Sequence, residues 1–282
     1  MTRAFRFCRI AASLGAALFA LAASAAADFG KCEVTGERGS ITLTTVVPGA
    51  LSVRPILSSP GWWNGDSLDT IQDGFEYCLA ATMAYRAGLD RVILVNRSFP
   101  QIITGQAKGF DIALSEITIT DERRKVVDFT QPYFSSDQGI LVKSGTKVGQ
   151  QSLRTLRYAV QQGTGAYAYV TERIKPAPTP KVFVDTATMY AALAAGQVDA
   201  VIYDTPNVLF RAKKSNGLFE VAGRFDTGEK WGGLVNKGSP NLDAFNKLID
   251  DFRKDGTLDR LAAKYLTPAL GEDPAKLAVL TP

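Results

Sequence analysis

The sequence has 282 residues, with 32 basic and 28 acidic side chains and no histidine. The formal net charge of +4 is too small for the basic surfaces by which proteins bind nucleic acids or anionic membranes. Without histidine, catalysis by a Ser-His-Asp or Cys-His arrangement is excluded, and most metal sites lose a common ligand. We therefore expect no nucleic acid as a partner, no metal and no other cofactor.

The first 27 residues are predicted to be a signal peptide. Arg3, Arg6 and Arg9 precede an apolar run from residue 10 to about residue 23, and the small residues 24–27 suit cleavage by a signal peptidase. A retained membrane anchor is the alternative, but the run is short, rich in alanine and not followed by a cluster of charges. We therefore expect export to the periplasm, and a mature chain with a net charge near +1.

Two cysteines, Cys32 and Cys78, remain after removal of the signal peptide. An even pair of cysteines in an oxidising compartment favours a disulfide. Two unpaired buried thiols are the alternative. A lipid anchor on Cys32 is disfavoured, because residues 29–31 lack the small apolar residues that precede a lipidated cysteine.

Strands and helices are predicted to alternate along the first half of the mature chain. Phe75, Leu79 and Met83 recur at helical spacing, whereas the apolar runs on either side are short and typical of strands. The expected elements are a strand at 40–47, a helix at 74–87, a strand at 92–96, a short helix at 100–108, a strand at 110–114 and a helix that begins at Asp121.

The second half follows the same plan. Strands separated by helices of this length indicate right-handed βαβ units and parallel sheets. The sequence therefore predicts two α/β units of similar plan. The second unit has strands at 157–160, 181–184 and 198–203, and helices at 166–173, 186–195 and 206–214.

Two extended segments connect these units. Residues 136–142 lead out of the first unit, residues 230–235 lead out of the second, and amphipathic helices follow at 242–252 and 258–265. Because the chain crosses between the two units twice, the last helices are expected to pack back on the first lobe, with a hinge and a cleft between the lobes. A tandem of two domains with one linker is the alternative. We predict a first lobe made of residues 28–136 and 233–282, and a second lobe of residues 137–232 that includes the hinge strands.

A candidate ligand-binding residue lies at the start of the helix that follows the strand at 110–114. Thr120 is a good N-cap, but Arg123 places a cation near the positive end of the helix dipole. A planar guanidinium at a strand-to-helix corner suits a ligand carboxylate. The alternative is a surface arginine paired with Asp121 or Glu122.

Two further polar groups are expected at the carboxyl ends of strands in the second lobe, where ligands of open α/β sheets bind. Residues 163–165, Gly-Thr-Gly, open a helix and present free N–H groups to an anion, although an ordinary glycine turn is the alternative. Thr205 and Pro206 suit the start of the next helix, so Asp204 is free to bond an ammonium group or neighbouring backbone. Together with Arg123, these groups complement a zwitterion.

A highly specific block of sequence runs from Ile117 to Arg123 and continues with Val127-Asp128-Phe129. In these and further motifs, which follow one another along nearly the whole mature chain, the sequence resembles the periplasmic amino-acid-binding proteins of ABC importers. That solute-binding family includes glutamine-, histidine- and lysine/arginine/ornithine-binding proteins. The further motifs are Gly74-Phe75-Glu76 with Leu79, Phe110-Asp111-Ile112-Ala113, Gln161 with Gly163-Thr164-Gly165, Gly196-Gln197-Val198-Asp199-Ala200, Asp204-Thr205-Pro206, Lys237-Gly238-Ser239 and Asp255-Gly256-Thr257-Leu258.

The resemblance implies an α/β, two-lobe periplasmic-binding-protein fold that closes like a Venus flytrap over one free amino acid or amino-acid derivative. It implies that Arg123 holds the ligand carboxylate, helped by the hydroxyls of Thr118 and Thr164 and by the amides of Thr164 and Gly165. It implies that Asp204 holds the ligand amine. We expect a monomer that delivers its ligand to the membrane permease of an ABC transporter.

Three features depart from the family pattern. Glu116 stands where the family usually has a small residue, and its carboxylate either faces the ligand amine or points away. Arg97 stands near the place of a usual aromatic residue, where it stacks on the ligand or binds an acidic side chain. Residues 48–72 are longer than the family norm and hold Trp62 and Trp63. Either one tryptophan supplies a stacking wall, or both fill the core of the insertion.

The expected function is therefore binding of a polar amino acid rather than catalysis. An enzyme is the alternative, because a few proteins similar to this family are periplasmic dehydratases of cyclic carboxylic acids. Glu116 would then serve as a general acid. A receptor-type sensor domain is a third interpretation, disfavoured because no apolar run of transmembrane length follows Tyr265.

Overall fold

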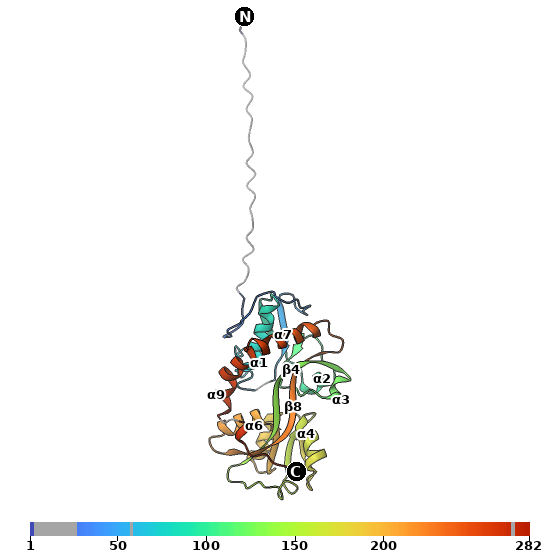
Figure 1. Ribbon diagram of the computed structural model, residues 1–282, viewed down its shortest axis with the longest axis vertical. Coiled ribbons are helices and arrows are strands. Elements are labelled where there is room, and N and C mark those ends of the chain that lie inside the picture. The colour runs from blue at the N-terminus through green and yellow to red at the C-terminus, as the bar shows by residue number, and fades with distance from the viewer. Residues whose placement is uncertain (3–26, 57–58, 272–273) are drawn as a thin grey trace.

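Two long antiparallel strands run through both halves of the molecule, β4 (Val127–Lys143) and β8 (Phe219–Asn236). They pair from one end to the other, from Val127 opposite Asn236 to Lys143 opposite Phe219, with several register shifts on the way. The structure is a computed structural model that describes residues 1–2, 27–56, 59–271 and 274–282. Figure 1 shows the two strands crossing between an upper and a lower lobe, here called lobe one and lobe two.

The strands form a single eight-stranded sheet in the order β2-β1-β3-β8-β4-β7-β5-β6. In lobe one, β1 pairs in parallel with β2 and β3. In lobe two, β5 pairs in parallel with β6 and β7. The prediction of a two-lobe α/β fold with parallel sheets and two hinge strands is confirmed. The shorter strands are β1 (Ala50–Arg54), β2 (Arg91–Leu94), β3 (Ile112–Ala113), β5 (Tyr158–Gln161), β6 (Lys181–Phe183) and β7 (Ala200–Asp204).

The helices fall close to the positions that the sequence predicts. Lobe one holds α1 (Phe75–Arg86), α2 (Phe99–Ile103) and α3 (Asp121–Arg124). Lobe two holds α4 (Gly165–Tyr169), which continues as a π-helix at Val170–Ile174, then α5 (Thr186–Ala194) and α6 (Thr205–Lys214). The chain ends with α7 (Leu242–Lys254), α8 (Thr257–Leu261), a π-helix at Ala262–Leu266, α9 (Thr267–Leu270) and a 3₁₀-helix at Pro274–Lys276.

The core of lobe one is built around α1, whose residues are almost all buried. Helix α7 covers the same core with Phe245, Leu248 and Phe252, so the C-terminal helices do return to lobe one. A disulfide between Cys32 and Cys78 ties the N-terminal segment to α1 and closes a loop with a sequence separation of 46 residues. The disulfide prediction is thus confirmed.

The sequence-based prediction of a strand at residues 40–47 is wrong. These residues alternate between half-buried and exposed positions, and Ile41 and Leu43 pack on the core of lobe one, but only Val47 forms an isolated bridge. Residues 40–46 follow the core surface without a neighbouring strand to pair with. The first strand is instead β1, which is buried along its whole length between β2 and β3. The segment 48–72 therefore supplies a central strand of lobe one.

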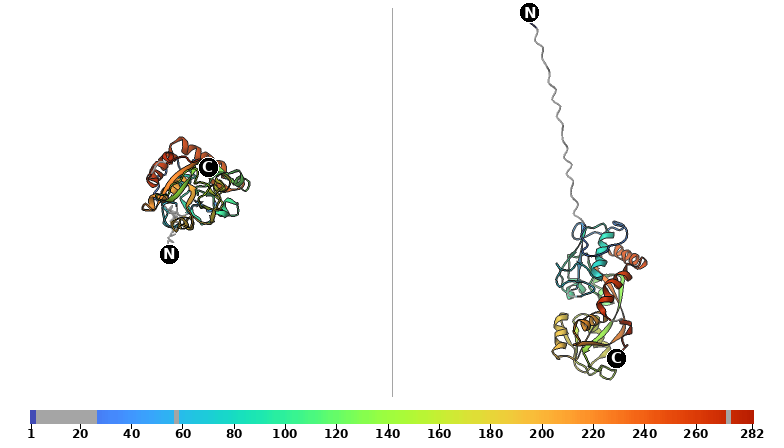
Figure 2. Two further views of the ribbon diagram at one scale, coloured as in Figure 1. Left: turned by 90° about the horizontal axis from the view of Figure 1, so that it is seen from below. Right: turned by 90° about the vertical axis from the view of Figure 1, so that its left-hand side faces the viewer.

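The last residues of the chain end on lobe two. Val279 pairs with Arg224 of β8, and the backbone bonds from Arg224 N to Ala278 O and from Leu280 N to Arg224 O measure 2.8 and 2.7 Å. The side chain of Leu280 packs against the core of lobe two. Figures 1 and 2 show the C-terminus on that lobe. The predicted assignment of all of residues 233–282 to lobe one therefore fails at its C-terminal end.

Within the described part of the chain, no helix has both the length and the apolar character needed to cross a membrane. The predicted signal peptide, residues 1–27, lies almost wholly outside the described residues, so it stays a prediction.

Candidate functional site

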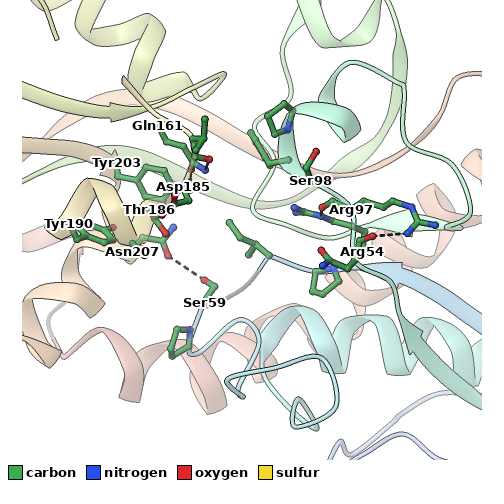
Figure 3. A pocket seen from close by; sticks show the side chains of 18 of the residues that line it. Arg54, Ser59, Arg97, Ser98, Gln161, Asp185, Thr186, Tyr190, Tyr203 and Asn207 are labelled. Carbon is green, nitrogen blue, oxygen red and sulfur yellow. Dashed lines mark hydrogen bonds between the residues drawn. The ribbon is translucent and has the colours of Figure 1, made fainter. Parts of the chain in front are cut away.

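A cavity of about 520 Å³ lies between the two lobes. Figure 3 shows side chains of lobe one, among them Arg54, Arg97 and Ser98, facing side chains of lobe two. The lining from lobe two has donors and acceptors on several different elements. Its labelled members are Gln161, Asp185, Thr186, Tyr190, Tyr203 and Asn207.

Two arginines give the lobe-one wall a positive charge. Arg54, at the end of β1, is buried and donates from Nε to the carbonyl of Arg97 and from Nη1 to Ser115 Oγ, both at 2.8 Å. Burial lowers the pKa of Arg54 to about 10, so the group stays charged at neutral pH. Arg97 lines the cavity and donates from Nε to the carbonyl of Lys108. This wall suits a ligand group that accepts hydrogen bonds.

The lobe-two wall is polar and internally bonded. Tyr203, on β7, donates from its hydroxyl to Gln161 Oε1 at 3.0 Å. Asp185 caps α5 by accepting from the amide of Thr188 at 2.8 Å. The guanidinium of Arg211 lies 5.0 Å from the centre of the Tyr190 ring. These contacts fix the side chains that face the lobe-one arginines.

Arg123 lies at the boundary between the lobes and is only 8% exposed. Thr120 caps α3 as predicted, accepting from the amide of Arg123. The guanidinium donates to the carbonyl of Thr118 in lobe one and, at 2.7 Å, to the carbonyl of Gly163 in lobe two. Burial lowers its pKa. It makes no ion pair within 4 Å with an acid of the described residues, so pairing with Asp121 or Glu122 is not what the structure contains.

Asp204 lies at the end of β7 and does not cap α6 with its side chain. Its Oδ1 accepts from Gln138 Nε2 at 2.8 Å. The same Nε2 donates to Glu229 Oε1, also at 2.8 Å. Burial raises the pKa of Asp204 well above its usual value, and the nearby carboxylate of Glu229 raises it further. Arg123 lies close enough to offset part of this effect by its charge.

The turn at residues 163–165 opens α4 as an ordinary glycine turn, and the amide of Thr164 donates to the carbonyl of Gln161 at 3.4 Å, so its role as an anion site stays a prediction. Thr164 caps α4 by accepting from the amide of Tyr167, and its hydroxyl donates to the carbonyl of Gln161 at 2.8 Å. Gly165 leaves space for a carboxylate, because a Cβ added there would lie 2.8 Å from Glu229 Oε1. Thr118, opposite this turn in lobe one, donates from Oγ1 to Glu229 Oε2 at 2.8 Å.

Glu116 adopts a left-handed backbone conformation, with φ of 53°. Its amide donates to Glu76 Oε1 at 2.9 Å, which holds this conformation in place. Its carboxylate accepts from Asn207 Nδ2 of lobe two at 2.7 Å and from the hydroxyl of Ser59. Burial, and then the charge of Glu76, raise its pKa well above the usual value. The side chain therefore points across the boundary between the lobes, while Ser59 and Asn207, rather than Glu116, line the cavity.

Glu76 is a fully buried carboxylate behind the site. It accepts from the indole Nε1 of Trp63 at 2.5 Å and from the hydroxyl of Tyr133. Burial raises its pKa to about 7, although the hydrogen bond from Tyr133 favours the charged form.

The two tryptophans of the segment 48–72 lie in the core and not in the cavity. Trp62 packs edge-on against Phe75, Phe134 and Trp231, with ring centres 4.8 to 5.1 Å apart. Trp63 is fully buried and bonded to Glu76. The second of the two alternatives is therefore the one that the structure contains, with the difference that this core belongs to lobe one as a whole. We do not carry either residue into the proposed site.

Sequence reasoning missed several polar residues near the site. Arg54 sits at the end of a strand that was not predicted, and Tyr203 directly precedes Asp204. Gln138 and Glu229 lie within the hinge strands, where alternation shows that each faces one side of the strand but does not show which side faces the cleft.

Residues 68–268 match the sequence profile of the bacterial extracellular solute-binding proteins, family 3. This chain belongs to that family. The match covers α1, both hinge strands and all of the cavity-lining elements except β1 and the loop that follows it.

Individual relatives agree with this assignment. The chain is similar to the L-cystine-binding protein TcyJ of Escherichia coli K12, with 28% identity over 243 residues that cover 85% of this chain and 87% of TcyJ. Among solved structures, it is similar to an ancestral arginine-binding protein bound to glutamine, with a TM-score of 0.70, 30% identity and coverage of 78% and 98% of the two chains. It is also similar to the ancestral amino-acid-binding protein AncCDT-1, a precursor of cyclohexadienyl dehydratase, with a TM-score of 0.67, 30% identity and coverage of 77% and 95%.

Proposed function

We propose that this protein is the substrate-binding component of an ABC importer and that it closes over one free amino acid or amino-acid derivative. The observation that carries the proposal is that a buried cation, Arg123, and a half-buried carboxylate, Asp204, lie near enough at the boundary between the lobes to influence each other by their charges. A zwitterion is the ligand that satisfies both charges, because a buried charge is tolerated when it is paired. The relatives named for binding cystine and arginine support the same ligand class.

A free hydrogen-bond acceptor beside Asp204 supports the position of the ligand amine. Gln138 is 1% exposed, and its Oε1 has no hydrogen-bond partner among the described residues. The Nε2 of the same amide is bonded to Asp204. An ammonium group near these two side chains would bond the carboxylate of Asp204 and the carbonyl oxygen of Gln138 together.

The cavity supports a ligand with a polar side chain. Arg123 and Asp204 do not line this cavity themselves, but each adjoins a lining residue, Phe99 and Tyr203 respectively. A ligand whose ends are held near Arg123 and Asp204 would extend its side chain toward Arg54 and Arg97, which favour an acceptor such as a carboxylate or an amide. A volume of about 520 Å³ lies within the usual range for small-molecule sites. Cystine, glutamine and arginine are the first candidates because similar proteins are named for binding them or contain them.

Binding rather than catalysis is the proposal for Glu116. Both of its carboxylate oxygens accept hydrogen bonds, one from Ser59 and one from Asn207. A general acid must reach the reacting group with its proton, whereas both oxygens of this carboxylate are already bonded to side chains of the protein itself. We further propose that the mature chain is a periplasmic monomer that presents its closed form to a membrane permease.

A thermal-shift screen of the twenty amino acids, cystine and opines, followed by calorimetry on the hits, tests this function. We expect at least one amino acid to raise the melting temperature and to bind with a single site. No stabilisation by any of them would contradict the proposal. Conversion of prephenate or arogenate, followed by aromatic absorbance, would favour the dehydratase instead.

A further inference from the structure

One carboxylate of the chain itself occupies the corner proposed for the ligand carboxylate. Glu229 accepts from Thr118 Oγ1 at 2.8 Å through Oε2 and from Gln138 Nε2 at 2.8 Å through Oε1. Its Oε1 also lies against Gly165, at the start of α4, where a Cβ would come within 2.8 Å. Thr118 and Gly165 belong to opposite lobes, so the side chain of Glu229 lies between the lobes.

The strand geometry explains why Glu229 points inward. Along β8, exposed and less exposed residues alternate, with Lys230 exposed and Trp231 fully buried. Lys230 turns outward and bonds Ser135 of the neighbouring strand. Because side chains of a strand alternate between its faces, Glu229 shares the inner face with Trp231. The backbone of β8 thus directs the carboxylate of Glu229 toward the boundary between the lobes.

The charges at the corner fit an anion that is already bound. Arg123 is buried, and the charge of Glu229 raises its pKa against the lowering effect of burial. Asp204, a second carboxylate, shares the Nε2 of Gln138 with Glu229. A ligand carboxylate that entered this corner with Glu229 in place would make a third negative group beside a single described guanidinium, Arg123. Carboxylates that share one hydrogen-bond donor lie close together, and like charges this close repel strongly in a site shielded from solvent.

We propose that Glu229 is an internal competitor of the ligand: its carboxylate holds the empty protein closed, and the carboxylate of the bound amino acid displaces it. This inference rests on the proposed function, because it assigns the Arg123 corner to a ligand carboxylate. The exchange replaces one anion by another, so the charge around Arg123 is conserved. The affinity for ligand is reduced by the fraction of molecules in which Glu229 fills the corner.

Two variants of Glu229 and one control test the proposal. Glu229→Ala removes the competing group, and Glu229→Gln removes its charge at nearly constant size. Lys230→Ala is the matched control, because Lys230 is the exposed neighbour on the same strand and makes one surface hydrogen bond. The ligand is the amino acid that gives the largest thermal shift with the unchanged protein, and small-angle scattering of the empty proteins reports closure.

We expect Glu229→Ala to bind this amino acid about tenfold more tightly by calorimetry, which is the gain that follows if Glu229 fills the corner in about nine-tenths of the empty molecules. Glu229→Gln should bind more tightly by a smaller factor, and Lys230→Ala should bind as the unchanged protein does. The empty Glu229→Ala protein should scatter as a more extended particle. Equal or weaker binding by Glu229→Ala, or identical scattering of the two empty proteins, would overturn the assignment of Glu229. Failure of the unchanged protein and the variant to bind any amino acid would instead reject the proposed function itself.

Discussion

Arg123 donates a hydrogen bond from Nη2 to the carbonyl of Gly163, 2.7 Å away. The donor belongs to lobe one and the acceptor to lobe two, so one side chain joins the halves of the molecule. The other arm of the guanidinium bonds the carbonyl of Thr118, and the group lies 5.6 Å from the centre of the Phe99 ring. Arg123 is therefore held in one orientation. Its removal should have two separable effects: loss of the hydrogen bond between the lobes, and loss of the cation proposed to bind the ligand carboxylate.

Replacement of Arg123 by alanine should weaken binding of the amino-acid ligand by at least about 100-fold, because a charged hydrogen-bond pair contributes roughly 1.5–3 kcal/mol per bond. Calorimetry with the ligand from the thermal-shift screen measures this change. Arg124→Ala is the control, since Arg124 is exposed and lies over the ring of Phe129. Binding by Arg123→Ala within about threefold of the unchanged protein, on the same energy scale, would contradict the assignment.

Asp204→Asn should weaken binding of amino acids by about 10- to 100-fold while leaving the fold intact. The amide oxygen of asparagine can still accept from Gln138, but the negative charge that would hold an ammonium group is lost. Competition experiments with an amino acid and with the corresponding carboxylic acid that lacks the amine separate the two ends of the ligand. Asp226→Asn, an exposed substitution on β8, should change neither affinity. A loss of equal size for both ligands would argue against an ammonium site at Asp204.

Joint replacement of Cys32 and Cys78 by serine should lower the free energy of unfolding by about 4 kcal/mol, the loop-entropy value for this spacing. The loop has a sequence separation of 46 residues, and it joins the N-terminal segment to the most buried helix of lobe one. Urea unfolding at fixed pH measures the difference. Reductant should destabilise the unchanged protein and leave the double variant unaffected. An equal effect of reductant on both proteins would contradict the prediction.

The raised pKa of Glu76 should make the protein less stable as the pH rises toward neutrality. Its pKa is raised from 4.5 to about 7 by burial, so between these values the folded protein holds a proton that the unfolded chain releases. The contribution of Glu76 to the free energy of unfolding is therefore greatest below about pH 4.5. It falls by up to about 3 kcal/mol as the pH rises to about 7. Urea unfolding at pH 5 and pH 8 should show this fall, and Glu76→Gln should reduce it.

The acids Glu116 and Asp204 have pKa values raised in the same direction, so Glu76→Gln is expected to reduce the dependence of stability on pH and not to remove it. Glu37→Gln, at an exposed position, should leave the slope unchanged. A variant Glu76→Gln with the slope of the unchanged protein would place the titration elsewhere.

Local apolar periodicity was enough to predict most of the helices and, apart from β1, the parallel strands of both lobes. It failed where pairing depends on distant segments. Residues 40–47 have the composition of a strand but lie on the core without a partner, whereas the shorter run of β1 is enclosed between β2 and β3. The position of the C-terminal residues could not be predicted from their sequence. It depends on two backbone hydrogen bonds with Arg224 and on the packing of the Leu280 side chain.

At the site, the sequence indicated those residues that break a local rule. Arg123 is a cation at the start of a helix, and Asp204 is a carboxylate that helix capping does not use; the structure places both at the boundary between the lobes. Gln138 and Glu229 break no such rule, since either face of a strand accepts a polar residue. Which face meets the cleft depends on the register between β4 and β8 and on its shifts, and register is a property of the assembled sheet.

The two ends of the folded chain lie on different lobes. Asp28 bridges to Arg91 in lobe one, whereas Val279 bridges to Arg224 in lobe two. If the lobes close over the ligand as proposed, fluorophores attached near residue 28 and at the C-terminus would sit on different lobes, and energy transfer between them would report that closure. A sensor of ligand binding could therefore be made by labelling the two ends of the folded chain, without a label inside the site.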